Sequence, residues 1–310
     1  MRTHKLEFFL FFCLMFMVAG CAPQSEEVTL GDATAESTKS TASESQSNPT
    51  SPASGLELSL EALMDQNIYA PSIGQPVSLK DGDFVFTNGM RVYFLPQAAF
   101  GDLNNDQMAD AVVLLAEKNV LHEVLVSLIV LIQENGEFNQ KADLLIGKDA
   151  EIYSITIDHA EITLNALLRN TGEDMDLPER NVWQTYQYWG ETLVLTKVSS
   201  SINQGTLRTI EISSPVDGDQ VGASVFLKGG MPVSPFENNL RFTVFDMEGQ
   251  LLTQSGFMVD AEEMGTPAVF SNKVDLPPLP SGTRVRLELA DLSMADGSLI
   301  AMDSVWVTIK

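Results

Sequence analysis

The sequence predicts a mainly β protein with an antiparallel-sheet (α+β) domain at residues 56–199 and a β-sandwich at residues 206–310. Three observations predict this fold class. Short apolar or alternating runs recur along both segments, separated by Gly, Pro, Asn and Asp turns. The alternation of strands with helix-length segments that marks a parallel sheet is missing. A length of 310 residues with 44% apolar residues allows about two domains, each with its own core.

The charge of the chain excludes one large class of function. The formal net charge is −24, and no run of basic residues occurs in the sequence. Binding to nucleic acid needs clustered Lys and Arg against the phosphates, so we expect no nucleic-acid partner. The two cysteines are Cys13 and Cys21. Residues 22–310 therefore form no disulfide, and their cores depend on packing.

The first 20 residues have the pattern of a signal peptide. Arg2 and Lys5 precede an apolar run, 8–19, that is too short to span a bilayer as a helix. The run leads into Val-Ala-Gly-Cys at 18–21, which resembles the lipobox of bacterial lipoproteins. The resemblance implies cleavage just before Cys21, a lipid on its sulfur, and a lipid-anchored protein at the extracytoplasmic face of the cell membrane. The alternative is an ordinary secreted protein with a chance cysteine near its cleavage site.

Residues 21–55 connect this cysteine to the first folded domain. They are rich in Ser, Thr and Glu and have almost no aromatic side chains. Such a segment cannot bury enough apolar surface to offset the entropy lost on ordering, so we expect a disordered tether. As a flexible coil it would hold the folded part roughly 30 Å from the membrane.

Residues 56–199 are expected to form one short helix and a series of strands. The helix is expected at 56–64, with Ser59 as its cap. The run 120–133 is mostly apolar and also fits a buried helix, but its β-branched residues and the following Asn135-Gly136 turn favour a strand. The expected strands are 82–87, 90–95, 109–116, 120–133, 151–158, 161–168, 182–189 and 192–198.

Four aromatic side chains gather in the predicted strand 182–189. Alternation places Trp183 and Trp189 on one face and Tyr186 and Tyr188 on the other. One of the two faces is expected to belong to the core. Exposed aromatic side chains are typical of carbohydrate-binding surfaces, whereas strands also favour aromatic residues for ordinary packing, and both interpretations stay open.

The loop 101–110 carries the sharpest chemical signal. Oxygen-bearing side chains stand at its relative positions 1, 3, 5 and 9, counted from Asp102, which is the spacing of a calcium loop. The candidate calcium ligands are Asp102, Asn104, Asp106, the backbone carbonyl of Met108, and Asp110. The alternative is an Asx-rich turn, in which the side chains bond their own backbone.

This loop resembles the Asp-x-Asn-x-Asp-Gly-x-x-Asp loop of FG-GAP-type propeller repeats, which also leads into an apolar strand, here 111–115. Gln107 stands where that pattern has glycine. The motif occurs once, whereas a propeller needs many copies, so we expect no propeller. The loop is also similar to that of a little-described domain of bacterial surface lipoproteins, which carries a single Gly-Asp-Leu-Asn loop.

Residues 206–310 are expected to form a sandwich of immunoglobulin type, because they contain seven short strands and many Gly, Pro and Asp turns. The expected strands are 209–213, 224–228, 240–246, 251–259, 268–274, 284–290 and 305–309. Phe236 is expected to be a core residue, and Asp296-Gly297-Ser298 a turn before the last strand.

Several short motifs follow one another along this segment. In chain order they are Ile212-Ser213-Ser214-Pro215, Gly218, Val221, Gly229, Phe236-Glu237-Asn238-Asn239-Leu240, Asp246 with Gly249, Phe270-Ser271, and Asp296-Gly297-Ser298. Together they resemble the immunoglobulin-like domain of bacterial spore germination. The resemblance implies an extracytoplasmic module without known catalysis.

The sequence contains no recognised catalytic motif. A Gly-x-Ser-x-Gly elbow, a His-Glu-x-x-His zinc helix and a phosphate-binding glycine loop are all missing. The histidines that remain after processing are His122, expected in strand packing, and His159, expected in a tight turn. We therefore expect that the protein is not an enzyme.

The function expected is that of a non-catalytic binding or structural module of the cell envelope. It would contact the membrane through the lipid on Cys21 and take a cell-wall glycan or an envelope protein as its partner. Two alternatives stay open. One is an envelope glycan hydrolase that uses a carboxylate pair. The other is the ligand receptor of a transport system.

Overall fold

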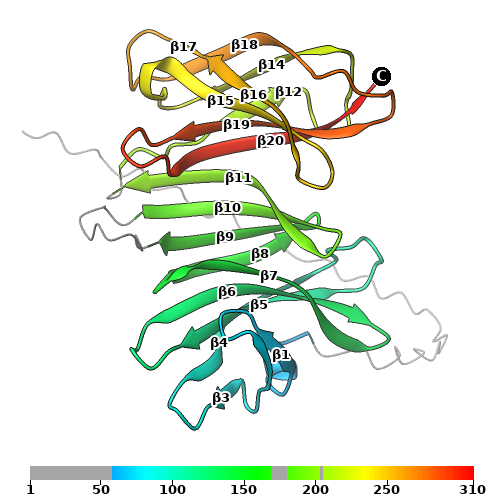
Figure 1. Ribbon diagram of the computed structural model, residues 1–310, viewed down its shortest axis with the longest axis vertical. Coiled ribbons are helices and arrows are strands. Elements are labelled where there is room, and N and C mark those ends of the chain that lie inside the picture. Colours follow the sequence, from blue (N-terminus) through cyan, green and yellow to red (C-terminus); the bar gives the residue numbers. More distant parts are fainter. Residues whose placement is uncertain (1–57, 169–179, 203–204) are drawn as a thin grey trace, which may run out of the picture. The chain divides into compact units, whose positions relative to one another are not determined.

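The computed structural model describes residues 58–168, 180–202 and 205–310 (Figure 1). Nearly all regular structure in these residues is β-strand, which confirms the predicted fold class. The described residues all fall within one compact unit. The predicted signal peptide, residues 1–20, and the predicted tether, residues 21–55, lie outside the described residues, which begin at Leu58.

The N-terminal half, residues 58–202, contains three groups of paired strands. β1 and β2 form a hairpin, β3 to β7 form a sheet in chain order, and β8 to β11 pair in chain order within a larger sheet. The elements are η1 (Glu61–Leu63), β1 (Asn67–Ala70), β2 (Gln75–Ser78), β3 (Asp83–Val85), β4 (Arg91–Gly101), β5 (Asp110–Lys118), β6 (Val124–Glu134), β7 (Glu137–Lys148), β8 (Glu151–Asp158), β9 (Glu161–Leu168), β10 (Arg180–Trp189) and β11 (Thr192–Ile202).

Most of these strands agree with the predicted ones, and β8 and β9 have the predicted bounds. Residues 124–133 of the apolar run 120–133 lie in the strand β6 and not in a helix, but residues 120–123 form a turn before it. The expectation that His122 packs in a strand is therefore wrong, since this residue is exposed in that turn with a positive φ of 68°. Residues 58–64, the described part of the helix predicted at 56–64, contain the single turn η1, where the Ser59 hydroxyl oxygen accepts the N–H of Ala62 at 3.4 Å. The strands β1, β2 and β7 were not predicted, and the sequence of β7 mixes polar and apolar residues without clear alternation.

The sheet β3 to β7 is covered on both faces, which explains its unbroken apolar runs. Val112 and Leu114 of β5 belong to a core shared with β8, β9 and β10. Their neighbours Val113 and Leu115 point the other way, into a core closed by η1 and the β1–β2 hairpin. A strand that is buried on both faces needs apolar side chains at every position, so the usual alternation disappears.

The C-terminal half, residues 205–310, is a sandwich of two sheets around one core. One sheet has the order β12-β14-β18-β17, and the other contains β16-β15-β19-β20, with β13 parallel to β20. This is the arrangement of an immunoglobulin-like sandwich. The elements are β12 (Glu211–Ser214), β13 (Gln220–Val221), β14 (Ser224–Met231), η2 (Phe236–Asn238), β15 (Asn239–Phe245), β16 (Leu251–Met258), β17 (Asp260–Ala261), β18 (Ala268–Asp275), β19 (Arg284–Leu292) and β20 (Leu299–Ile309).

The prediction that Phe236 lies in the core is wrong, since 47% of this residue is exposed. The preceding residues Ser234 and Pro235 are buried in its place. The Ser234 hydroxyl oxygen accepts the N–H of Gly265 at 2.7 Å and so fixes the loop. Glu237, the next residue, has a positive φ of 54°, and the backbone turns there with the Phe236 ring left outside.

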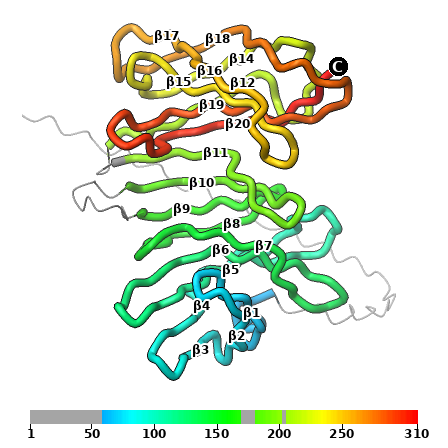
Figure 2. The backbone as a smooth tube through the Cα atoms, viewed as in Figure 1, coloured from blue at the N-terminus to red at the C-terminus, as the bar shows by residue number. Residues whose placement is uncertain are grey.

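The two halves share one sheet. β11 pairs antiparallel with β20, and the result is a nine-stranded sheet that runs β16-β15-β19-β20-β11-β10-β9-β8, with β13 beside β20 (Figures 1 and 2). We call the contact of β11 (Thr192–Ile202) with β20 (Leu299–Ile309) the seam. Because β11 covers it, β20 is not a free sheet edge along the seam.

Candidate functional site

The predicted lipidation site, Cys21, lies outside the described residues. In the part of the chain that is described, no helix is long and apolar enough to cross a membrane.

The predicted calcium loop connects β4 to β5, and its side chains bond the backbone of the loop itself. The Asp102 carboxylate accepts the N–H groups of Asp106 at 3.1 Å and Gln107 at 2.9 Å. Asp106 accepts the N–H of Met108 at 2.8 Å, and the Asn104 amide donates to Asp106 at 3.0 Å. Asn105 and Gln107 both have positive φ, so the backbone turns tightly here. These are the bonds of an Asx-rich turn.

Asp110, the last candidate calcium ligand, is fully buried at the start of β5. Its carboxylate accepts the N–H of Leu103 at 2.9 Å and that of Gln133 at 3.0 Å, and so joins the loop to β6. Burial raises the pKa of Asp110, although these two hydrogen bonds act in the opposite direction. Among the described residues, no group of three His, Cys, Asp or Glu side chains is placed to hold a metal. Calcium binding by the loop therefore stays a prediction.

The aromatic side chains of β10 divide between its two faces as predicted. Tyr186 is buried in the core of the N-terminal half, and Tyr188 packs against that core. Burial raises the pKa of the Tyr186 hydroxyl. Trp183 and Trp189 lie on the other face, each 37% exposed. The Trp189 ring stacks on Trp306 of β20, with 6.2 Å between ring centroids. Trp189 therefore packs between the two halves and is also partly exposed at the surface.

The backbone ladder of the seam is short, and side chains extend it. Its register contains two pairs, Lys197 with Asp303 and Val198 with Met302. The Ser304 hydroxyl donates to the carbonyl oxygen of Thr196 at 2.8 Å. Beyond the other end of these two pairs, the Ser200 hydroxyl donates to the carbonyl oxygen of Ile300 at 2.6 Å.

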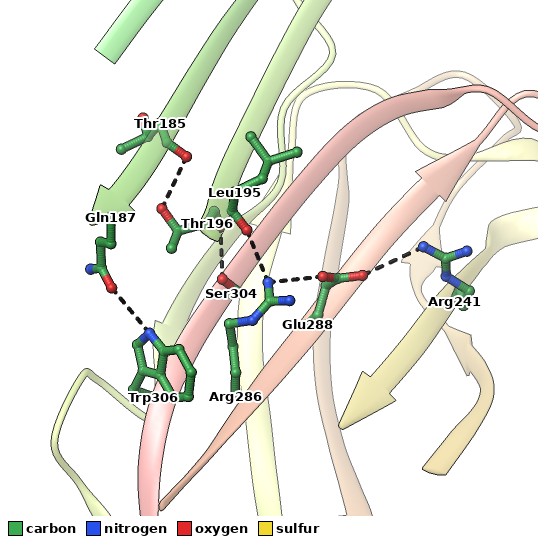
Figure 3. A network of polar contacts seen from close by, with 9 residues as sticks. All are labelled: Thr185, Gln187, Leu195, Thr196, Arg241, Arg286, Glu288, Ser304 and Trp306. Atoms are coloured by element: carbon green, nitrogen blue, oxygen red, sulfur yellow. Dashed lines mark hydrogen bonds and ion pairs between the residues drawn. The ribbon is translucent and has the colours of Figure 1, made fainter. Parts of the chain in front are cut away.

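Arg286 is the centre of the polar network at the seam (Figure 3). Its Nη1 donates to the carbonyl oxygen of Leu195 and to Glu288 Oε2, both at 3.0 Å. Its guanidinium carbon lies 4.6 Å from the centroid of the Phe245 ring. Burial lowers the pKa of Arg286, and the neighbouring Glu288 carboxylate opposes this. A cation of β19 is thus bonded to the backbone of β11.

Trp306 makes a further polar link between the two halves. Its indole Nε1 donates to Gln187 Oε1 at 3.1 Å, and its backbone N–H donates to Asp217 Oδ1 at 2.7 Å (Figure 3 shows the first of these). The guanidinium carbon of Arg284 lies 5.0 Å from the ring centroids of both Trp189 and Trp306.

A cavity of about 320 Å³ opens at the seam beside Trp306, and four carboxylates line it: Glu161, Glu211, Asp217 and Asp303. Three of the four already accept hydrogen bonds. Glu161 accepts the Gln187 amide at 3.0 Å, Asp217 accepts the N–H of Trp306, and Asp303 accepts the N–H of Ile212 at 2.7 Å. These bonds hold neighbouring segments together, which favours a structural role for the carboxylates over an acid–base pair.

A larger groove, of about 720 Å³, lies on the seam beside Arg286. We call it the Arg241 groove. It has the size of a small-ligand site and combines apolar walls with a few charged groups. It is lined by residues 189–190 and 192–195 of the β10–β11 hairpin, by the turn 247–249, and by Arg241, Phe245, Arg286, Glu288, Leu299 and Met302.

Sequence reasoning did not find Arg241, Arg286 or Glu288. The available signal was weak: charged residues stand among apolar ones in both predicted strands, 240–246 and 284–290. The arginines become a site only because the β10–β11 hairpin, far away in the sequence, closes one side of the groove.

The C-terminal half has the architecture of an immunoglobulin-like module, a class of domain that generally serves binding or structural functions. Residues 209–298 match the family model described as the immunoglobulin-like domain of bacterial spore germination, which confirms the predicted resemblance. No curated protein and no solved structure matches the chain.

The calcium hypothesis predicts that a chelator lowers the melting temperature of the protein and that Asp106→Ala abolishes this response. A cation present at 100 times its Kd would stabilise the fold by about 2.7 kcal/mol. Asp246→Ala is the matched control, because Asp246 accepts two backbone N–H groups in a different turn. This variant should keep the chelator response. If the wild-type protein shows no response to the chelator, the loop is an Asx-rich turn alone.

Asp303→Asn tests how much the buried negative charge of Asp303 lowers the stability of the folded protein. Burial raises the pKa of Asp303, against the opposing effects of the Ile212 N–H and of Lys197. A raised pKa means that the folded state holds this proton more tightly than the unfolded state. The stability that this bound proton contributes is complete at pH values below the pKa that Asp303 has in the unfolded protein. It is lost as pH rises through the pKa that Asp303 has in the folded protein.

Urea unfolding between pH 3 and pH 7 should therefore show Asp303→Asn gaining stability relative to wild type as pH rises. Asp275→Asn makes the same change of charge at an exposed position of β18, and its curve should follow wild type. A relative loss of stability by Asp303→Asn with rising pH would contradict the assignment.

Proposed function

We propose that this protein is a lipid-anchored, extracytoplasmic lipoprotein that acts as a non-catalytic binding module of the cell envelope. The anchoring part of the proposal rests on the lipobox-like sequence that ends at Cys21 and on the signal-peptide pattern before it. Two acyl chains or more suffice for stable membrane attachment. The partner would be a cell-wall glycan or an envelope protein.

The Arg241 groove is the observation that carries the binding part of the proposal. It brings together apolar and charged side chains from both halves in a space of ligand size. The match of residues 209–298 to an immunoglobulin-like family supports a binding or structural role for the C-terminal half.

The two alternative functions are less well supported. A glycan hydrolase needs two carboxylates free to act as acid and base or nucleophile. In the cavity beside Trp306, three of the four carboxylates instead accept hydrogen bonds from the protein. A transport receptor built from two similar α/β lobes does not fit the described residues, which form β-sheets in both halves.

Replacing Cys21 tests the anchor. The wild-type protein should incorporate a labelled fatty acid in a bacterial host and sediment with membranes, whereas Cys21→Ser should do neither, because it lacks the acylated sulfur. Cys13→Ser is the matched control. It removes the other cysteine, which lies within the predicted signal peptide, and should leave labelling unchanged. A mature protein that retains Met1, or that carries a free thiol at Cys21 in mass spectrometry, would contradict the proposal.

A further inference from the structure

The guanidinium group of Arg241 has unused hydrogen-bonding capacity. Within the described residues its side chain makes one hydrogen bond, from Nη2 to Glu288 Oε1 at 3.4 Å, and its buried Nε has no partner. Arginine has five N–H donors in a planar fork that matches a carboxylate. The side chain is 35% exposed and lines the groove, so a ligand can reach it.

The other charges of the groove favour a ligand with one negative charge. Glu288 is 5% exposed and is already held by Arg286 at 3.0 Å, so these two groups largely neutralise each other. Glu248 lies at the turn 247–249 and is exposed. A dianion would meet repulsion from Glu248 and from the net charge of −24, whereas a single carboxylate can pair with Arg241 at lower cost.

The apolar walls indicate what carries that carboxylate. Leu195, Phe245, Met247, Leu299 and Met302 all line the groove. The groove volume of about 720 Å³ is much larger than a carboxylate group alone needs. It can hold a ligand of about two amino-acid residues.

We propose that the Arg241 groove binds the C-terminal end of a peptide, with the free carboxylate on Arg241 and an apolar last side chain against the walls. This inference rests on the proposed binding function and names the chemistry of its partner. The carboxylate would take the N–H donors that Arg241 does not use within the protein. Arg286 is a positioning residue, because its hydrogen bonds to Glu288 and to the Leu195 carbonyl hold one side of the groove.

The test compares two probes that differ only at their end, acetyl-Leu-Phe with a free carboxylate and acetyl-Leu-Phe-amide, by calorimetric titration of the purified full-length protein. The acid should bind at least about tenfold more tightly than the amide, because a hydrogen bond to a charged group contributes that much. Arg241→Gln should abolish this preference, because it removes the charged group that separates the acid from the amide.

Arg91→Gln is the matched control, since it removes an exposed arginine that pairs with Asp83 in the N-terminal half. It should keep the preference for the acid. Arg241→Lys should keep a reduced preference, because it retains the charge and loses the fork. A thermal melt checks that each variant is folded.

Equal affinity for acid and amide, a preference that persists in Arg241→Gln, or no binding of either probe at millimolar concentration would overturn the inference. Equal affinity for 3-phenylpropanoate and the dipeptide acid would overturn the assignment to a peptide. Membrane attachment depends on Cys21 and not on Arg241. Failure of this test with attachment intact therefore refutes the inference alone.

Discussion

The pairing of β11 with β20 is the contact on which the rest of the structure depends. Two register pairs form its backbone ladder, which is too few to hold the two halves together by themselves. Apolar contact among Val198, Ala290 and Met302 and the hydrogen bonds of Arg286, Ser304 and Trp306 complete it. The seam also covers strand β20, which would otherwise offer unpaired N–H and C=O groups to other chains. One contact thus joins the halves and protects a strand from aggregation.

The charges at the seam make this contact selective. The Arg286 and Glu288 side chains are 10% and 5% exposed, and Arg286 needs the Leu195 carbonyl from the other half as a further acceptor. Breaking a buried ion pair by removing one partner typically costs about 3–5 kcal/mol, because the remaining charge is left uncompensated. The β10–β11 hairpin must therefore pack against the C-terminal half in one position. In this position it also forms one side of the Arg241 groove. The candidate binding site is in this sense a consequence of how the halves are joined.

Local patterns predicted much of the fold. The strands β8 and β9 could be predicted with their bounds, because their apolar residues alternate and turns enclose them. The immunoglobulin-like half could be recognised from turns and short motifs spread over residues 212–298. In β10, alternation correctly separated Tyr186 and Tyr188, which face the core, from Trp183 and Trp189.

The features that escaped prediction depend on contacts distant in sequence. The strand β7 has few buried residues and lies at the end of its sheet, so its apolar pattern is weak. Phe236 has the character of a core residue, but the buried Ser234 and Pro235 take its place. No local pattern could show that Leu195 would meet Arg286, 91 positions later, or that the groove would form between them.

Differential scanning calorimetry of the mature protein tests most directly whether the seam makes the two halves one body. A single cooperative unit unfolds in one transition, with a calorimetric enthalpy equal to the van't Hoff enthalpy. We predict one such transition, in which the fluorescence of Trp183, Trp189 and Trp306 changes together with the heat absorption. Two separate transitions, or a calorimetric enthalpy about twice the van't Hoff value, would show that the halves unfold independently and would contradict the account.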